Sequence, residues 1–229
     1  MNINILLKYF SYSICIIIFG FASTKQTTNS IKSNPDNSYF EGKIIYEVSY
    51  ESKKKNLTKE QVGLFIGNKQ TYTIKDNMYK NEMNGTLKMS QYYLGTDTLY
   101  ISTAQSKELL WIDVTYLNDE IVSTEITENI EEVNGILCNL LTIKSNNGYF
   151  KYYYNSSYKI NPKNYPNHKV GFWNVCIAQT KSIMIKSILD TKDEHIELNV
   201  MDIKHMEVND SEFELPNLPR KRFPIKKKN

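Results

Sequence analysis

The sequence is short of the residues and motifs by which many enzyme families are identified. Its 229 residues include nine glycines, three histidines and three cysteines. It has no nucleophile elbow, zincin histidine pair, Walker loop or dinucleotide fingerprint, and with so few glycines no loop can hold a phosphate closely. We therefore expect a non-enzymatic protein without a cofactor, although catalytic groups that meet only in space leave no such motif.

Cysteine is too rare to form a disulfide framework. Cys15 lies in an apolar run near the N-terminus, which leaves Cys138 and Cys176 for the rest of the chain. Their separation excludes a C-x-x-C redox pair or a zinc knuckle, and the apolar neighbours of both suit a buried free thiol as well as a disulfide. Both alternatives stay open.

The apolar run from Tyr9 to Phe21 is too short to span a bilayer, because a spanning helix needs roughly 20 residues. Lys8 precedes it, and Gly20 and Ala22 put small side chains where a signal peptidase needs them. We predict an export signal at residues 1–22 and a location in the periplasm or outer envelope; a retained anchor is the alternative. Cys15 lies within the run, so no lipid-modified N-terminus is expected.

Positive charge is concentrated at the C-terminus. Removing the leader's one cation and the tail's six from the formal net charge of +3 leaves the body at −4. A nucleic-acid partner is not expected, because such proteins normally carry their positive charge on the folded domain. The basic tail, residues 217–229, is either a solvated terminus or a contact with anionic lipid or polysaccharide. Its cations are Arg220, Lys221, Arg222, Lys226, Lys227 and Lys228.

What the sequence does have is aromatic residues, with 17 tyrosines and nine phenylalanines, which favour strands. After a polar leader at residues 23–38, aromatic and branched residues alternate with charged ones from Phe40 to Glu51, which predicts a half-buried antiparallel strand. Thr58 and Gln61 form a capping-box pattern that predicts a short helix or turn, with a strand as the alternative. We expect one domain at residues 39–216.

Turn residues at short intervals divide the following chain into strands, and the pairs Asn84-Gly85 and Asn147-Gly148 are the strongest signals for type I′ hairpin turns. The fold class is mainly β, a curved antiparallel sheet or half-barrel with one or two short helices. Residues 156–171 form a long loop, with a short helix inside it as one alternative, that leads Phe172 and Trp173 into the next strand. The loop is either a lid or a solvated excursion. The other predicted strands are 71–74, 78–83, 86–94, 98–103, 109–116, 121–126, 135–144, 149–154, 182–189 and 194–200.

Two groups of side chains are candidate sites. His195 and Glu197 share one face of a predicted strand and are close enough to bind one metal ion, with His168 or His205 as the only conceivable third ligand. A charged solvent face explains them as well. The cluster of aromatic residues from Tyr149 to Tyr158 suits a concave surface for a lipid-like or aromatic ligand, with core packing as the alternative.

Four short segments carry a family resemblance: Phe40–Val48, Val133–Asn139, Phe150–Tyr154 and Phe213–Pro216. They resemble a family of small exported envelope proteins of unknown function from Gram-negative bacteria, similar in plan to the LolA/LolB-type lipoprotein carriers. That resemblance implies a curved antiparallel sheet, partly closed by helices, that holds acyl chains. The chain departs from this plan in having little helix to serve as a lid.

These expectations combine into one functional hypothesis. We expect an exported envelope protein that binds a hydrophobic or lipid-like ligand, or an envelope protein, on a concave aromatic sheet face. The alternative is a structural or protein-interaction module without a ligand cavity. The expected lining residues are Cys138, Tyr149, Tyr152, Tyr153, Tyr154 and Trp173, and no metal site is expected.

Overall fold

The computed structural model describes residues 39–53 and 58–223. The predicted export signal and the leader lie outside these ranges. In the described ranges, no helix is both long and apolar enough to cross a membrane.

One sheet of twelve strands forms the protein, in the order β12-β6-β5-β4-β3-β2-β1-β11-β10-β9-β8-β7. All neighbours are antiparallel except β12 and β6. The strands are β1 (Gly42–Ser52), β2 (Lys69–Lys75), β3 (Met78–Met83), β4 (Ser90–Leu94), β5 (Thr98–Ser102), β6 (Leu109–Asp113), β7 (Ile121–Val133), β8 (Ile136–Ser145), β9 (Gly148–Lys159), β10 (Ser182–Thr191), β11 (Glu194–His205) and β12 (Arg220–Arg222).

The described residues also form two short α-helices, α2 (Lys59–Ile66) and α3 (Trp173–Thr180). Three 3₁₀ turns complete the elements: η2 (Pro162–Asn164), η3 (Val170–Phe172) and η4 (Asp210–Phe213). The predicted fold class, mainly β with a curved, largely antiparallel sheet and two short helices, is confirmed.

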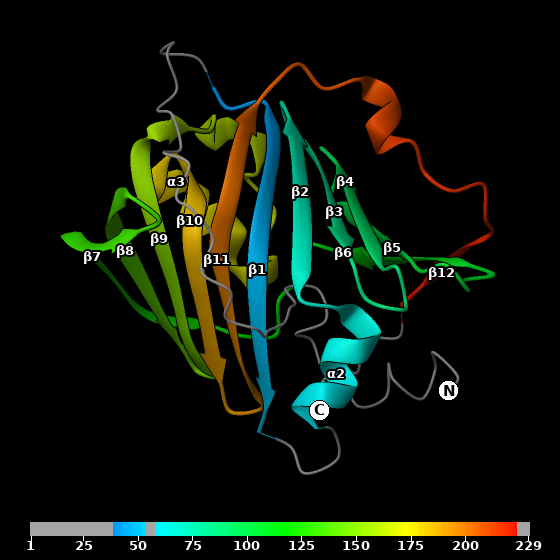
Figure 1. The fold of residues 1–229 in the computed structure, drawn as a ribbon, viewed down its shortest axis with the longest axis horizontal. Helices are drawn as coiled ribbons and strands as arrows, with labels where there is room; N and C mark the ends of the chain where they lie inside the picture. The colour runs from blue at the N-terminus through cyan, green and yellow to red at the C-terminus, as the bar shows by residue number, and fades with distance from the viewer. Residues whose placement is uncertain (1–38, 54–57, 224–229) are drawn as a thin grey trace.

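Two wings of consecutive strands meet at the centre of the sheet (Figure 1). Strands β1 to β6 form one wing and β7 to β11 the other, each with every strand beside its sequence neighbour. The wings join where β1 pairs with β11, from Gly42 opposite His205 to Ser52 opposite Glu194. A single long-range pairing therefore makes two meanders into one continuous sheet.

The alternation predicted for the first strand is confirmed. Gly42, Ile44, Tyr46, Val48 and Tyr50 are buried on one face of β1, and the residues between them are partly exposed. Because directly paired residues share a face, this inner face can be followed across the sheet from the register.

The sheet curves around the segment from residue 160 to residue 180. The ring of Trp173 lies 6.5 Å from that of Tyr72 on β2 and 6.5 Å from that of Tyr152 on β9. Four strand spacings separate β2 from β9, which is about 19 Å in a flat sheet. The two strands can contact the same side chain only because the sheet bends towards it, and we call this inner face the concave face.

The segment leading to α3 differs from the prediction. Residues 156–159 extend β9, so the loop begins at Ile160, and Phe172 and Trp173 do not lead into a strand. Phe172 ends η3 and Trp173 begins α3, so that part of the prediction was wrong. The short helix that the sequence allowed in this loop corresponds to the 3₁₀ turns η2 and η3, and nothing in the sequence indicated α3 after them.

The hairpins predicted at Asn84-Gly85 and Asn147-Gly148 are confirmed, because β3 pairs with β4 and β8 with β9, but the predicted type I′ turn geometry was wrong. Neither residue of Asn84-Gly85 has positive φ, and Asn147-Gly148 has only the extended φ of 158° at Gly148. Instead Asn134 and Gly135 have φ of 48° and 81°, and they connect β7 to β8. Type I′ geometry needs positive φ at both central residues, which this pair provides.

Thr86 and Leu87, predicted as the start of a strand, instead join Gly85 in completing the C-terminal end of α2. The backbone N–H groups of Gly85, Thr86 and Leu87 donate to the carbonyls of Ile66, Leu64 and Phe65. These carbonyls have no partner within the helix, so the loop satisfies them. Strand β4 consequently begins at Ser90.

Three residues of the expected basic tail belong to the sheet. Arg220, Lys221 and Arg222 form β12 and pair in parallel with residues 109–111 of β6. The sheet therefore extends past residue 216.

The capping box predicted at Thr58 is present, and it generates a stability prediction. The Thr58 hydroxyl accepts from the Gln61 N–H at 3.3 Å, and the Gln61 side chain accepts from the Thr58 N–H at 3.0 Å. We expect Thr58→Ala to lower the free energy of unfolding by about 1 kcal/mol, because it leaves an N–H group of the first turn without its cap. Urea unfolding measures the change. Thr58→Ser keeps the hydroxyl and should stay near wild type; equal losses in both variants would contradict the capping role.

A tyrosine-lined concave face as the candidate site

The segment from residue 160 to residue 180 covers the concave face with aromatic side chains. In Figure 1, α3 lies behind the strands of the β9–β11 wing. Phe172 packs edge-on against Phe150 of β9 at 4.8 Å, and Tyr165 lies 5.7 Å from Tyr93 of β4. The segment therefore contacts both wings of the sheet.

Left-handed backbone conformations bracket α3. Gly171 and Phe172 have φ of 65° and 55° at its start, and Lys181 has φ of 53° at its end. For a bulky residue such as Phe172 this conformation is unusual and costs roughly 1–2 kcal/mol. Strain of this kind persists only where surrounding contacts hold it, and it often marks a functional element.

Stacked tyrosines line the concave face on β2, β3 and β4. The ring of Tyr79 stacks between Tyr72 at 4.9 Å and Tyr93 at 5.3 Å. The register explains the stack, because Tyr79 and Tyr93 are directly opposite each other and Tyr72 lies on the neighbouring strand with the same orientation. Burial raises the pKa of Tyr72 well above its usual value, so its hydroxyl keeps its proton.

His168 is buried in the middle of this aromatic group. Its Nε2 lies 2.7 Å from the Tyr79 hydroxyl oxygen, and its ring is 4.9 Å from that of Tyr93. Burial lowers the pKa of His168 to about 4, so the imidazole is neutral near pH 7. The sequence analysis named His168 only as a possible third metal ligand.

Several buried polar atoms around this group have no hydrogen-bond partner among the described residues. On the covering segment they are His168 Nδ1, Trp173 Nε1 and Asn174 Oδ1. On the sheet they include Gln70 Oε1 and Asn81 Oδ1. Each buried polar atom left unpaired costs roughly 1–3 kcal/mol, so this group requires partners that the described chain does not supply.

The sheet atoms of this set face the concave side. Asn81 is paired with Tyr72 across β2 and β3, and Gln70 is paired with Tyr46 across β2 and β1, so each pair shares a face. The side-chain N–H of Asn81 donates to Gln91 Oε1 at 3.0 Å. The side-chain oxygen of Asn81 takes no part in this hydrogen bond. Polar and aromatic side chains thus share the concave face of β2, β3 and β4.

Of the six predicted lining residues, the structure brings three to the concave side. Tyr152, Tyr154 and Trp173 are there, and the Tyr152 hydroxyl donates to the carbonyl of Gly171 in the covering segment. Tyr149 and Tyr153 lie on the opposite face of β9, because alternate residues of a strand point to opposite faces. A single strand cannot direct all its tyrosines to one site.

Cys138 also belongs to the outer side. It is paired with Glu131 of β7, whose carboxylate binds Lys186 at 2.8 Å, and Lys186 lies 5.0 Å from the Tyr153 ring. Cys138 and Cys176 are both buried free thiols. Burial raises the pKa of Cys138 to about 11, so this thiol is not a reactive thiolate.

The sequence analysis did not name the tyrosines of the other wing. Tyr72, Tyr79 and Tyr93 form the stack of rings on this wing. A signal existed in the predicted strands, where these tyrosines occupy inward positions of a two-residue period. It identifies an inner face, but not that this face meets residues 165–173.

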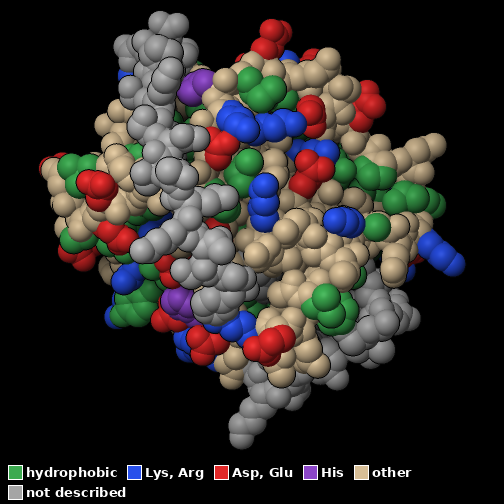
Figure 2. Space-filling model, in the orientation of Figure 1, with side chains coloured by type: hydrophobic (Ala, Val, Ile, Leu, Met, Phe, Trp, Pro, Cys, Tyr) green, Lys and Arg blue, Asp and Glu red, His purple; other side chains and the backbone are tan. Residues whose placement is uncertain are grey.

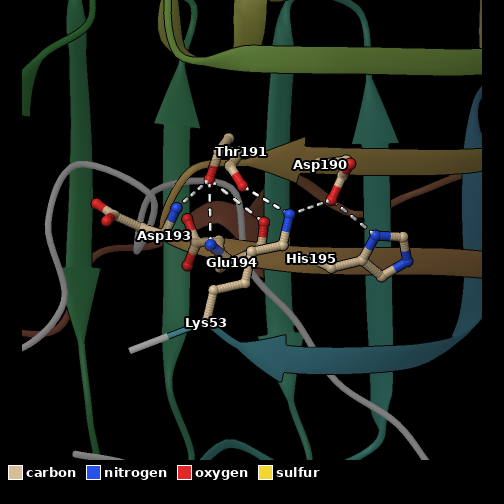
Figure 3. A network of polar contacts seen from close by, with 6 residues as sticks. All are labelled: Lys53, Asp190, Thr191, Asp193, Glu194 and His195. Carbon is tan, nitrogen blue, oxygen red and sulfur yellow. Dashed lines mark hydrogen bonds and ion pairs between the residues drawn. The ribbon is translucent and has the colours of Figure 1, made fainter. Parts of the chain in front are cut away.

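His195 lies in a separate polar network at the hairpin between β10 and β11 (Figure 3). Its Nδ1 is 3.1 Å from Asp190 Oδ1, an oxygen that also binds Lys53 Nζ at 2.7 Å. Glu197 instead pairs with Lys186 at 3.3 Å. The carboxylate nearest to His195, that of Asp190, therefore already forms an ion pair with Lys53. No three metal-ligating side chains come together anywhere in residues 39–53 and 58–223.

No protein-family model matches this sequence, and no curated protein matches it either. The resemblance of the four short segments to exported envelope proteins therefore stays a prediction.

Two solved structures show limited similarity. PNGF-II is 9% identical in sequence to this chain, with a TM-score of 0.41. The similarity covers 79% of this chain but only 30% of the PNGF-II chain. The Mycobacterium tuberculosis lipoprotein LppX is 10% identical, with a TM-score of 0.30 over 70% of this chain and 85% of LppX. Neither similarity identifies a function.

The burial of neutral His168 generates a pH prediction. Above pH 6.5 the histidine is neutral in both the folded and the unfolded chain, and its contribution to stability is complete. Between about pH 6.5 and about pH 4 only the unfolded chain binds the proton. The free energy of unfolding therefore decreases as the pH is lowered through this range, by about 3 kcal/mol in total. We expect His168→Gln to lose this part of the pH dependence in urea unfolding.

The control is Thr58→Ser, which changes no titratable group and should keep the wild-type slope between pH 6.5 and pH 4. A His168→Gln protein with an unchanged slope would show that His168 is not held neutral by folding.

Proposed function

We propose that this protein is an exported, non-catalytic binding protein that holds a hydrophobic or lipid-like ligand with a polar end between the concave face and the segment from residue 160 to residue 180. The observation that supports this most is the group of unpartnered polar atoms buried among aromatic rings. An ordinary core would exclude such atoms or pair them.

The rings supply the apolar part of the site. Tyr72, Tyr152 and Trp173 approach one another from β2, β9 and α3. Aromatic side chains of this size bury a large area and tolerate ligands of different shapes, and their polar tips fix a ligand's orientation. A chain or ring system with few polar atoms suits this lining.

The unpartnered atoms supply the polar part. Trp173 Nε1 offers a donor, Asn81 and Gln70 offer carbonyl oxygens, and His168 Nδ1 offers one further hydrogen-bonding position in either tautomer. A ligand with both a donor and an acceptor at one end, such as a hydroxyl or amide, satisfies several of these atoms together. A pure hydrocarbon satisfies none of them.

The covering segment provides the route of entry in this proposal. Its left-handed residues at Gly171, Phe172 and Lys181 lie at the two ends of α3, where a change of backbone conformation would release strain as α3 moves. In this role α3 and the loop before it together serve as the lid, one of the two alternatives that the sequence left for residues 156–171.

Export is part of the proposal and rests on residues 1–22. N-terminal sequencing of the protein recovered from an exporting host tests it. A mature chain that begins at Ser23 supports export, and a protein that begins at Met1 opposes cleavage.

A second function, docking of an envelope protein, is favoured by β7. This edge strand is thirteen residues long and exposes Val122, Ile126 and Ile130. Among the described strands only β8 pairs with it, so its outer backbone groups can accept another strand. Ile126→Lys would weaken such docking without changing ligand binding at the concave face.

The two tryptophans give a direct test of ligand binding. Trp173 lies at the concave face and Trp111 on β6, so Trp111→Phe leaves Trp173 as the only tryptophan. We expect its emission to change saturably with a zwitterionic single-chain lipid such as lysophosphatidylcholine, kept below its micelle-forming concentration, and native mass spectrometry to recover the bound molecule. Trp173→Phe, which leaves Trp111, should show no such change.

A matched pair of variants tests the polar end. Asn81→Leu removes an unpartnered concave oxygen and should weaken binding about fivefold to tenfold, the range expected for one lost hydrogen bond. Asn199→Leu changes the same residue type on the other face of β11 and should leave affinity unchanged. Binding that neither variant alters, or no bound molecule in any lipid extract, would contradict the proposed site.

A further inference from the structure

The outer face of the sheet carries a row of rings and cations that the ligand site does not use. Five residues are directly opposite one another on adjacent strands: Lys80 on β3, Tyr92 on β4, Tyr100 on β5, Trp111 on β6 and Arg222 on β12. Directly paired residues share a face, so all five point the same way. We call them, together with Arg220, the outer row.

Cations lie over each ring of the outer row. Lys80 Nζ is 5.6 Å from the Tyr92 ring, the Arg220 guanidinium 5.2 Å from Tyr100, and the Arg222 guanidinium 5.2 Å from Trp111. Contacts of this length are attractive cation–π interactions. They hold the two arginines in fixed positions beside partly exposed Tyr100 and Trp111.

The two arginines differ from three lysines on the same face of β1, β2 and β3 in having no ion-pair partner among the described residues. Lys43, Lys75 and Lys80 pair with Glu212, Asp210 and Glu82 at 2.6–2.8 Å. Arg220 and Arg222 are exposed and form no ion pair with a carboxylate of the described chain. Figure 2 shows cations beside acidic side chains over the middle of the sheet, and a cation beside hydrophobic side chains at the edge where β12 lies.

Aromatic rings next to cations without an ion-pair partner in the described chain match the chemistry of an anionic membrane surface. Tryptophan and tyrosine favour the boundary between headgroups and acyl chains, and arginine binds phosphate with two parallel hydrogen bonds. In addition, residues 220–228 contain six cations and no acid, and clusters of four to eight cations are typical of segments that bind anionic lipid. A solvated tail would need no docked strand and no rings beneath its arginines.

We propose that the outer row is a membrane-contact surface that binds the phosphate headgroups of an anionic lipid bilayer through Arg220 and Arg222, with Trp111 and Tyr100 at the headgroup boundary. This surface is on the face opposite to the ligand site. A protein that takes up a lipid-like ligand on one face would thereby rest on the bilayer with the other.

The test compares the affinity of the full chain for phosphatidylglycerol vesicles with that for phosphatidylcholine vesicles. This ratio cancels any apolar contribution from the rest of the chain. We expect Arg220→Gln/Arg222→Gln to lower the ratio about 30-fold, since each cation near an anionic surface contributes about 1 kcal/mol. Raising the salt concentration should lower the wild-type ratio as well.

The control variant removes two cations from the other wing. Lys144 and Lys151 lie on the same face of β8 and β9, and Lys144 is 5.9 Å from the Tyr149 ring. Lys144→Gln/Lys151→Gln should change the ratio less than about threefold. Equal losses in the two double variants, or an unchanged ratio in the arginine variant, would overturn the proposal.

Tryptophan emission shows whether the outer row itself reaches the lipid. In Trp173→Phe the remaining Trp111 should be quenched by bromine-labelled phosphatidylglycerol, whereas Trp173 in Trp111→Phe should be quenched less. Vesicle binding without quenching of Trp111 would place the contact elsewhere. Binding to soluble polyphosphate that depends on the arginines, with no preference for phosphatidylglycerol vesicles, would show that the partner is an anionic polymer and overturn the membrane assignment.

Discussion

The packing of Trp173 between β2 and β9 is the contact on which the rest of the structure depends. The ring meets Tyr72 on one wing and Tyr152 on the other, at 6.5 Å each. Phe172 and Tyr165 of the same segment add contacts to Phe150 and Tyr93, so the segment gives the two wings a common surface to bury. A sheet joined only through β1 and β11 would be free to flatten. The curvature, the burial of His168 and the strained ends of α3 all follow from holding this segment inside the sheet.

The two faces of the β2–β6 region differ in chemistry because of the two-residue period of a strand. Tyr79 and Asn81 point to the concave side, where water is excluded and each polar atom needs a partner. Lys80, between them, points outward to Glu82 and the Tyr92 ring. A ligand site and a charged outer surface can thus be built on the same short strands, and a change on one face leaves the other largely intact.

Much of the fold could be predicted from the sequence, because its signals are local. The alternation in β1 and the capping box at Thr58 each depend on residues a few positions apart, and both are present. Helix α3 could not be predicted, because its formation depends on Phe172 and Trp173 burying their rings against Phe150 and Tyr152 of another strand. Only half of the predicted lining residues lie on the concave side. The reason is again structural, because alternation along β9 puts Tyr152 and Tyr154 on one face and Tyr149 and Tyr153 on the other.

The sequence by itself determined that this is a β protein built from a meander of strands with aromatic inner positions, since strand periodicity and short connections are properties of consecutive residues. Only the tertiary structure decided which inner positions meet. The stack of Tyr72, Tyr79 and Tyr93, the burial of His168 beside it and the docking of Arg220 and Arg222 over Tyr100 and Trp111 all join residues far apart in the chain. Such contacts depend on sheet order and curvature, which arise from the packing of the whole chain and leave no pattern in any short segment.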